Sequence, residues 1–283
     1  MDETEIQNFW ERNPCGDFLT GGLSKHGNKY EAFFQEYDEF RYRTESHILT
    51  RLDSIDFTNK QCLEIGLGQG ADSEQIIRRG AIWSGIDLTA ESVNRVRIRF
   101  ASRGLPFNSI KQGSVLQLPF DNNSFDIVYS HGVLHHVPQI KTANEEIWRV
   151  LKPNGLLILM LYAKFSLNYL VSISLIRRIG LIVLYLIRND SGAIYRQHID
   201  NAREMGLINY LKMDKFIHKN TDGPFNPYSK VYNIFSIKRD FPNFEIIKSK
   251  KHFMHAPPLP VKWLPLEGLL GWHLWAQMKP IHK

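Results

Sequence analysis

Apolar and polar positions alternate along the central part of the chain in a way that predicts strands separated by helices. Five short apolar runs have the length and composition of strands, at residues 61–65, 81–86, 106–111, 125–129 and 156–162. Segments with helical spacing lie between them, at 72–79, 90–102 and 139–151, and a turn is expected at 152–155. This alternation predicts βαβ units, and therefore a doubly wound α/β fold with a mostly parallel sheet.

Both flanks of this region have a different pattern. Residues 1–52 are predicted to form an N-terminal helical arm, because aromatic and aliphatic positions recur there at helical spacing. Residues 164–230 hold two helical stretches, at 167–187 and 194–212, which predict a helical cap inserted after the fifth strand.

Strands return after the cap, at residues 245–253 and 271–278. We therefore predict one core, formed by residues 53–163 and 231–283, that the cap interrupts.

The apolar stretch 167–187 has the length of a transmembrane helix, but two arginines lie at its centre. Arg177 and Arg178 would each cost about 2.5–3.5 kcal/mol in the middle of a membrane. Gly180 weakens the stretch further as a helix. We therefore expect a cap helix that is buried or faces the substrate, and no stable membrane insertion.

Composition changes this picture only slightly. Hydrophobic residues make up 43% of the chain and charged residues 23%, which is typical of a globular protein. The net charge of +6 is spread over scattered lysines and arginines, so no nucleic-acid partner is expected. Cys15 and Cys62 form neither a disulfide framework nor a metal-ligand cluster, and no metal is expected. The acidic start has no apolar signal core, so we expect a cytoplasmic protein; a homodimer stays open.

A glycine-rich loop between the first strand and the first helix is the main candidate for ligand binding. Gly66, Gly68 and Gly70 permit a tight turn and a close approach of ligand to backbone. Open α/β sheets bind nucleotides at this edge. The spacing of Gly66, Gly68 and Ala71 also satisfies a dinucleotide pattern, and Asp87 after the second strand suits a ribose in either case.

Charge distinguishes the two kinds of ligand. A dinucleotide places its pyrophosphate at the helix N-terminus, and carboxylates there would repel it. Glu64 precedes the loop and Asp72 follows it, which suits the ammonium and sulfonium of S-adenosylmethionine. Alternative interpretations are a solvent-facing strand end for Glu64 and a favourable first-turn helix charge for Asp72.

Further motifs follow the third and fourth strands in register. Residues 118–126 are Leu-Pro-Phe-Asp-Asn-Asn-Ser-Phe-Asp and residues 133–137 are Val-Leu-His-His-Val. With these motifs the sequence resembles the class I S-adenosylmethionine-dependent methyltransferases over about residues 60–162, and again at Gly271-Trp272. The resemblance implies a Rossmann-like sheet of seven strands with an antiparallel last strand, and S-adenosylmethionine as the cofactor.

The resemblance also implies a role for individual residues. Carried onto this chain, the cofactor positions are Glu64, Gly66, Gly68 and Gly70 at the methionine end, Asp87 at the ribose, Leu88, Ser114 and Val115 at the adenine, and Ser130 at the methionine amino group. Many relatives have an Asp where Ser114 stands, and a hydroxyl accepts a weaker bond from the adenine amino group. Arg43 and Tyr37 in the arm are candidates for the cofactor carboxylate, although an exposed helix face explains them equally well.

Methyl transfer depends mainly on alignment and on exclusion of water. A general base is needed only if the acceptor loses a proton, and His131 and His218 are the candidates for it. One member of the pair His135 and His136 is expected to pack beneath its loop. The apolar and aromatic cap predicts a closed pocket for a small organic acceptor, which these polar side chains would orient: Tyr162, His218, Asp222, Asn226 and Tyr228.

Three functions remain open from the sequence. The favoured one is methylation of an O or N atom of a small molecule, in secondary metabolism or glycan modification. The second is methylation of a lipid or quinone intermediate, which the apolar stretch 167–187 favours. A remote third is a NAD-binding oxidoreductase or a non-catalytic nucleotide-binding module.

Overall fold

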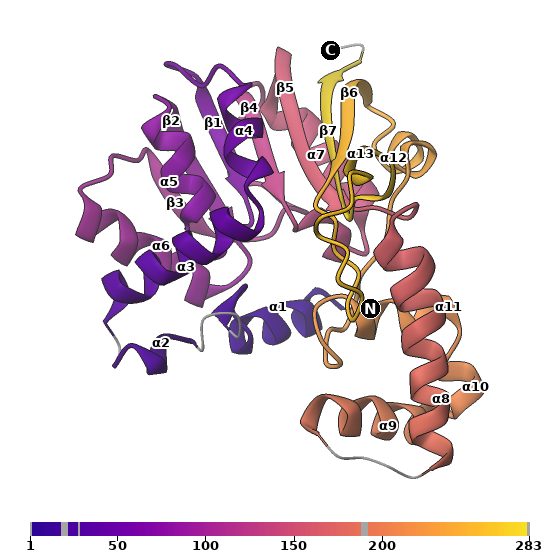
Figure 1. Cartoon of the computed structure of the whole chain (residues 1–283). Helices are drawn as coiled ribbons and strands as arrows, with labels where there is room; N and C mark the ends of the chain where they lie inside the picture. Colours follow the sequence, from indigo (N-terminus) through magenta and orange to yellow (C-terminus); the bar gives the residue numbers. More distant parts are fainter. Residues whose placement is uncertain (1, 18–21, 28, 188–191, 282–283) are drawn as a thin grey trace.

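A seven-stranded sheet forms the centre of the computed structural model, which describes residues 2–17, 22–27, 29–187 and 192–281. The strands are β1 (Gln61–Ile65), β2 (Ile82–Asp87), β3 (Ser109–Gln112), β4 (Phe125–His131), β5 (Leu151–Tyr162), β6 (Phe244–His252) and β7 (His273–Pro280). Their order is β3-β2-β1-β4-β5-β7-β6, and β7 runs antiparallel to both of its neighbours (Figure 1). The predicted fold, including the antiparallel last strand, is confirmed.

Helices cover both faces of this sheet (Figure 1). On one face α4 (His47–Asp53), α5 (Ala71–Arg78) and α6 (Ala90–Arg103) bury apolar side chains against β1, β2 and β4. On the other face α7 (Ile140–Val150) and α12 (Ile234–Asp240) pack against β5 and β7. The sheet is therefore the shared wall of two apolar cores, as its nearly continuous apolar strands require.

The turn predicted at residues 152–155 is not separate from the fifth strand. β5 begins at Leu151, which lies opposite Phe125, and the pairing resumes with Leu156 opposite Ile127. Residues 152–155 therefore form an irregularity inside the strand, because they have no partners in register on β4. The prediction was wrong about the strand boundary, although Pro153 and Gly155 do mark the irregularity.

The N-terminal arm folds back across the end of the sheet at which β1, β2 and β4 finish (Figure 1). It contains α1 (Glu3–Arg12), α2 (Gly22–Lys25) and α3 (Tyr30–Thr44). The Gln7 Nε2 donates to the Leu88 carbonyl at 3.0 Å. The Glu11 carboxylate accepts from the Ala90 and Glu91 amides, at 2.9 and 3.0 Å, at the start of α6. Negative charge is stabilised at a helix N-terminus, so these contacts fix α1 above the loop after β2.

The cap forms a third apolar cluster, in which its side chains pack with Trp272 of the core. A π-helix, η3 (Asn168–Arg177), continues directly into α8 (Arg178–Leu186), and α9 (Ala193–Met205), α10 (Leu207–Tyr210) and α11 (Met213–Phe216) follow. Ile173, Leu181 and Tyr210 belong to the cluster. Gly206, with φ of 79°, ends the helix that was predicted to run from 194 to 212. Residues 188–191 of the predicted cap lie outside the described residues.

One helix of the described chain, Asn168–Leu186, is long and apolar enough to cross a membrane, with a mean hydropathy of 1.8. Only 17% of it is buried, so the first of the two predicted alternatives, a buried helix, was wrong, whereas a helix that faces the substrate stays a prediction. The apolar composition correctly indicated a helix, but it could not show which of the apolar positions would find a partner.

Candidate cofactor and acceptor site

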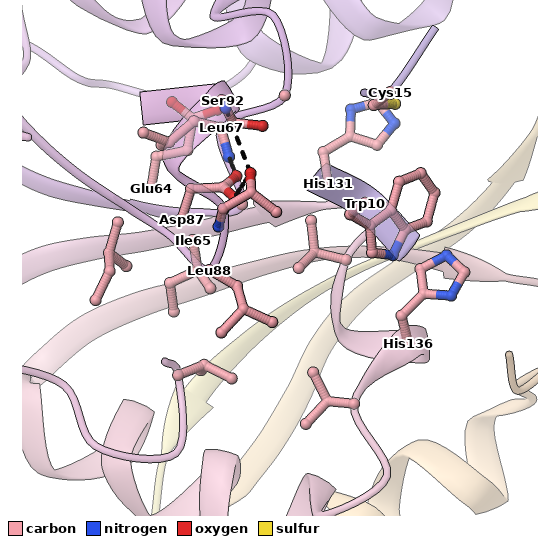
Figure 2. A pocket seen from close by; sticks show the side chains of 18 of the residues that line it. Trp10, Cys15, Glu64, Ile65, Leu67, Asp87, Leu88, Ser92, His131 and His136 are labelled. Atoms are coloured by element: carbon pink, nitrogen blue, oxygen red, sulfur yellow. Dashed lines mark hydrogen bonds between the residues drawn. The ribbon is translucent and has the colours of Figure 1, made fainter. Parts of the chain in front are cut away.

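A pocket opens at the end of the sheet where β1, β2 and β4 finish, and the arm forms one of its walls. The loop after β1, the end of β2 and the turn after β4 supply most of its lining. In Figure 2, Glu64, Asp87 and Leu88 lie on one side, and Trp10 lies between His131 and His136 on the other. The predicted residues that line it are Glu64, Gly66, Gly68, Asp87, Leu88, Val115, His131 and Tyr37.

The glycine loop has a conformation that side chains would disturb. Gly66 has φ of +80°, and a Cβ built on it would lie 2.2 Å from a methyl carbon of Val133. Gly70 has φ of +76° and precedes the first turn of α5. A non-glycine residue at Gly66 would therefore both strain the backbone and push Val133 into the pocket.

Asp87 organises the loop that it faces. Its Oδ2 accepts from the Leu67 amide at 2.7 Å, and its Oδ1 accepts from the Thr89 amide and hydroxyl at 2.8 and 2.7 Å. Burial raises the pKa of Asp87, and these hydrogen bonds oppose the rise. Asp87 also lines the pocket, so its carboxylate faces a bound ligand.

Glu64 is buried at the end of β1, with only 3% of its surface exposed. Its carboxylate accepts from the Trp83 Nε1 at 2.8 Å. Burial raises the pKa of Glu64 to about 8, because a charged carboxylate is costly away from water. The alternative of a solvent-facing strand end is thereby excluded, and a cation in the pocket would favour the ionised form.

Asp72 is the centre of a polar network rather than a free carboxylate. Arg41 makes a bidentate pair with it, with its Nε 3.0 Å and its Nη2 2.8 Å from the two carboxylate oxygens. The Tyr129 hydroxyl donates to it at 2.9 Å, and the His131 Nδ1 lies 2.8 Å away. Burial raises the pKa of Asp72, but Arg41 and His131 outweigh burial and hold it well below its usual range.

The arm contributes pocket residues that the sequence analysis missed. Arg41 lines the pocket, whereas Arg43 is exposed and does not. Arg41 lies four residues after the buried Tyr37, on the same face of α3, so helical spacing could have selected it. Trp10 and Glu3 of α1 also line the pocket, and no local sequence signal marks them.

Two predicted adenine and amino-group residues have protein partners instead of lining the pocket. The Ser114 hydroxyl donates to Glu3 Oε1 at 2.5 Å, and the Ser130 hydroxyl donates to the Ile65 carbonyl at 3.1 Å. Glu3 therefore places a carboxylate beside the position at which many relatives carry an Asp.

A second polar cluster joins the turn after β4 to the cap. The Tyr162 hydroxyl donates to Asp222 Oδ1 at 2.8 Å, and His136 Nε2 lies 3.4 Å from Asp222 Oδ2. The carbonyl of Tyr228 lies 2.7 Å from His136 Nδ1. The structure thus brings together three of the predicted acceptor-binding residues and adds His136 to them, but of these four residues only His136 lines the pocket.

The remaining predicted cap residues hold the cap together. His218 Nδ1 lies 2.8 Å from the Ser229 carbonyl, and burial lowers the pKa of His218. Asn226 is fully buried and donates to the hydroxyls of Thr221 and Ser229. Neither residue lines the pocket, which leaves His131 as the better placed of the two predicted bases.

A comparison with models of protein families identifies the domain that forms most of the pocket. Residues 63–159, which run from β1 through β5, match the model of the family described as a methyltransferase domain. Residues 63–159 form a methyltransferase domain. This match agrees with the resemblance to class I S-adenosylmethionine-dependent methyltransferases, and solved S-adenosylmethionine-dependent methyltransferases share the fold.

Curated relatives of the methyltransferase domain include lipid-modifying enzymes. The chain is 35% identical over 97 residues to a sterol 24-C-methyltransferase of Gibberella zeae, which covers 33% of the chain and 25% of the relative. It is 34% identical over 102 residues to a fatty-acid O-methyltransferase of Mycolicibacterium smegmatis, covering 35% and 36%. The matched region thus spans a quarter to about a third of these relatives.

Solved structures share the fold over most of the chain. A S-adenosylmethionine-dependent methyltransferase from Aquifex aeolicus superposes with a TM-score of 0.52 at 12% identity, covering 85% of this chain and 93% of the other. A putative one from Listeria monocytogenes gives 0.53 at 16% identity, covering 86% and 99%. At this identity the likeness supports the architecture around the methyltransferase domain.

Proposed function

We propose that this chain transfers the methyl group of S-adenosylmethionine to an O or N atom of a small organic molecule. The observation that carries the proposal is one continuous pocket, in which the cofactor residues Glu64 and Asp87 face the acceptor-side residues His131 and His136. Secondary metabolism or glycan modification is the setting that we favour.

Residues of three elements would hold the cofactor. Asp87 would accept hydrogen bonds from the ribose hydroxyls, and Glu64 would face the positive charge of the methionine end. Arg41, which Asp72 holds in place at 2.8 Å, would pair with the methionine carboxylate. Bound S-adenosylmethionine would supply a methyl group that its sulfonium already activates.

His131 has the orientation of a general base. A carboxylate 2.8 Å from Nδ1 selects the tautomer whose proton is on that nitrogen, so Nε2 keeps its lone pair. Asp72 thus acts as a positioning residue for His131. A hydroxyl acceptor would give its proton to His131 as the methyl group is transferred, whereas an ammonium would give up its proton first, because its nitrogen has no lone pair until then.

A lipid or quinone acceptor is the second candidate. The relatives that methylate sterols and fatty acids favour it, as does the exposed apolar helix Asn168–Leu186. An acceptor with a long apolar tail would leave only its reactive head in the pocket.

Calorimetry with S-adenosylhomocysteine and with NADH tests the cofactor. We expect S-adenosylhomocysteine to bind and NADH not to bind, and the reverse result would overturn the proposal. Asp87→Ala and Gly66→Val should each weaken S-adenosylhomocysteine binding at least tenfold, by loss of a charged hydrogen bond and by the Val133 clash respectively.

Arg41 and Arg43 form a matched pair for the carboxylate contact. Arg41→Gln should weaken binding of S-adenosylhomocysteine about tenfold or more, because a charged partner of the carboxylate is lost. Arg43→Gln, which is exposed on the same helix, should leave the affinity unchanged. Equal effects of the two substitutions would contradict the assignment of Arg41.

A further inference from the structure

In the cluster of His135, His136 and Asp222, imidazole nitrogens and a carboxylate oxygen face one another and lack hydrogen-bond partners. His136 Nδ1 lies 2.7 Å from the Tyr228 carbonyl, so this nitrogen carries the proton and donates it. His136 Nε2 is then an acceptor, yet it faces Asp222 Oδ2, another acceptor, at 3.4 Å. Neither atom has a hydrogen-bond partner.

His135 adds a third group to this cluster. Its side chain is fully buried, and neither ring nitrogen has a hydrogen-bond partner. Unpaired buried polar atoms are costly, and a cation shared by three ligand atoms that lie within 4.8 Å of one another would satisfy them.

We propose that His135, His136 and Asp222 bind one divalent transition-metal ion. Two imidazoles and one carboxylate are a common ligand set for zinc and for iron(II), and they leave coordination positions open. The neighbours of the cluster match such a site, because metal-bound histidines usually donate their second N–H to a carbonyl, as His136 does to Tyr228. Tyr162 similarly orients the carboxylate through Asp222 Oδ1.

The ion would lie beside the acceptor end of the pocket. His136 lines the pocket and also belongs to the cluster, so an open coordination position would face an acceptor oxygen. Metal binding would lower the pKa of a bound hydroxyl and so prepare it for methylation. This role rests on the proposed function, whereas the metal site itself does not.

A second group in the described chain, Glu45, His131 and His273, also has ligand atoms within 4.8 Å of one another. Its members already have partners within the protein: His131 Nδ1 lies 2.8 Å from Asp72, and His273 Nδ1 lies 3.3 Å from His47 Nε2. We therefore assign the ion to the first group, and Glu45 offers a matched control.

Titration of the tag-free protein with Zn²⁺ and Co²⁺ tests the site, by calorimetry and by the visible absorption of bound Co²⁺. We expect one ion per chain, at least tenfold weaker binding in Asp222→Asn, a smaller loss in Tyr162→Phe, and wild-type binding in Glu45→Gln. Absence of stoichiometric binding, or loss in Glu45→Gln instead, would overturn the proposal. S-adenosylhomocysteine binding, measured separately, shows whether the proposed function stands.

A different observation carries a second inference, about the outer surface of the cap. Exposed apolar side chains follow one line along η3 and α8: Leu170, Leu175, Ile179, Val183 and Leu186. The step of five residues at the start suits the wider turn of a π-helix, and the later steps of four and three suit an α-helix. The stripe is therefore one continuous face, and Leu186 is 70% exposed.

The segment that packs against the start of this helix adds charge and an exposed tryptophan. Leu167 packs with Met254 and Val261, and the Lys251 Nζ donates to the Phe165 carbonyl. Trp263 is 77% exposed, next to Lys262. Residues 164–187 and 246–266 together contain seven Lys or Arg and no Asp or Glu.

We infer that this apolar stripe and the basic segment 246–266 dock onto an anionic lipid surface. Apolar side chains with Trp, Lys and Arg beside them are typical of proteins that lie in the membrane interface. Basic residues add about 1 kcal/mol each near anionic headgroups. The arginines at the centre of the helix favour docking over spanning.

Co-sedimentation with vesicles tests the docking. We expect wild-type protein to bind vesicles of phosphatidylcholine with 30% phosphatidylglycerol, to bind pure phosphatidylcholine at least fivefold less, and to be released by alkaline carbonate. Ile179→Ser with Val183→Ser, and separately Trp263→Ser, should reduce binding, whereas Phe235→Ser, also exposed but on α12, should not.

Three outcomes would overturn the docking surface. Resistance to carbonate would indicate a transmembrane span. Equal binding to both vesicles would remove the electrostatic contribution. A dimer that Ile179→Ser with Val183→Ser dissociates, without vesicle binding, would make the stripe an interface between copies.

Discussion

At the scale of single residues, the pocket shows that neighbouring carboxylates have opposite electrostatic states. Glu64 has a pKa raised to about 8 by burial, whereas Arg41 and His131 hold Asp72 ionised despite its burial. The charge argument from sequence treated both as negative partners of a cation. In the structure Asp72 carries a permanent negative charge and positions Arg41 and His131. The protonation state of Glu64, in contrast, depends on whether a positive ligand is bound.

The raised pKa of Glu64 predicts that cofactor binding releases a proton. A positive ligand lowers the pKa of the buried carboxyl, so below pH 8 the affinity should rise with pH, by up to about tenfold per unit, and should level off above pH 8. Calorimetry of S-adenosylmethionine binding between pH 6 and 8, in two buffers of different ionisation enthalpy, measures the proton. Glu64→Gln should remove the pH dependence, and an unchanged slope in that variant would refute the explanation.

Glu3 is expected to replace the aspartate that the adenine loop lacks. Its carboxylate lies 2.5 Å from the Ser114 hydroxyl and lines the pocket, so it can accept from the adenine amino group. Glu3→Gln should weaken S-adenosylhomocysteine binding by about tenfold, as expected for a hydrogen bond to a charged group. Adding Ser114→Asp to Glu3→Gln should restore the affinity.

The exposed Glu5, in the same turn of α1, provides the control for this pair. Glu5→Gln should bind S-adenosylhomocysteine as the wild type does. Failure of Ser114→Asp to restore binding would mean that Glu3 acts only by holding α1 in place.

At the scale of elements, the arm covers the nucleotide-binding edge of the sheet and is held there by side-chain contacts. Gln7 bonds to the loop after β2, and Glu11 covers the first amides of α6. Asp17 pairs with Arg95 of α6, further along the arm. The contacts of α1 are mainly polar, and Ile6 is its one buried residue, so α1 should open more easily than the sheet.

Hydrogen exchange measures the opening of the arm. Glu11→Gln removes a negative charge from the α6 N-terminus, which should speed exchange in residues 3–12 several-fold while β1 and β4 stay protected. Saturating S-adenosylhomocysteine should slow the same amides. Faster exchange across the whole sheet would instead mean that Glu11 contributes to global stability.

At the scale of the whole molecule, most of the correct predictions rested on the regular spacing of apolar residues along the sequence. The alternating strands and helices, the parallel sheet and the glycine loop follow from local pattern, whereas the antiparallel last strand was implied by the family resemblance. The contact between His136 and Asp222 does not, because it depends on the path of the cap through space. The exposure of Ile179 and Val183 could not be predicted either, since an apolar residue does not specify its neighbour.

Ligand binding should stabilise the chain as a whole, because residues of the arm and of the methyltransferase domain both line the pocket. At about 100 times the dissociation constant, S-adenosylhomocysteine should add about 2.7 kcal/mol to the free energy of unfolding, or roughly 5 °C in Tm. Thermal scanning with and without the ligand measures this shift. NADH at the same concentration should give none, and a shift with NADH alone would contradict the cofactor assignment.

The position of α1 has a consequence for the catalytic cycle. Glu3 and Trp10 form part of the wall of the pocket, so we expect spent cofactor to be exchanged for fresh cofactor mainly while the helix is displaced. Every turnover then includes one departure and one return of the arm. The dwell time of S-adenosylhomocysteine would set the pace of repeated cycles, giving a fast first turnover, slower later ones and marked product inhibition.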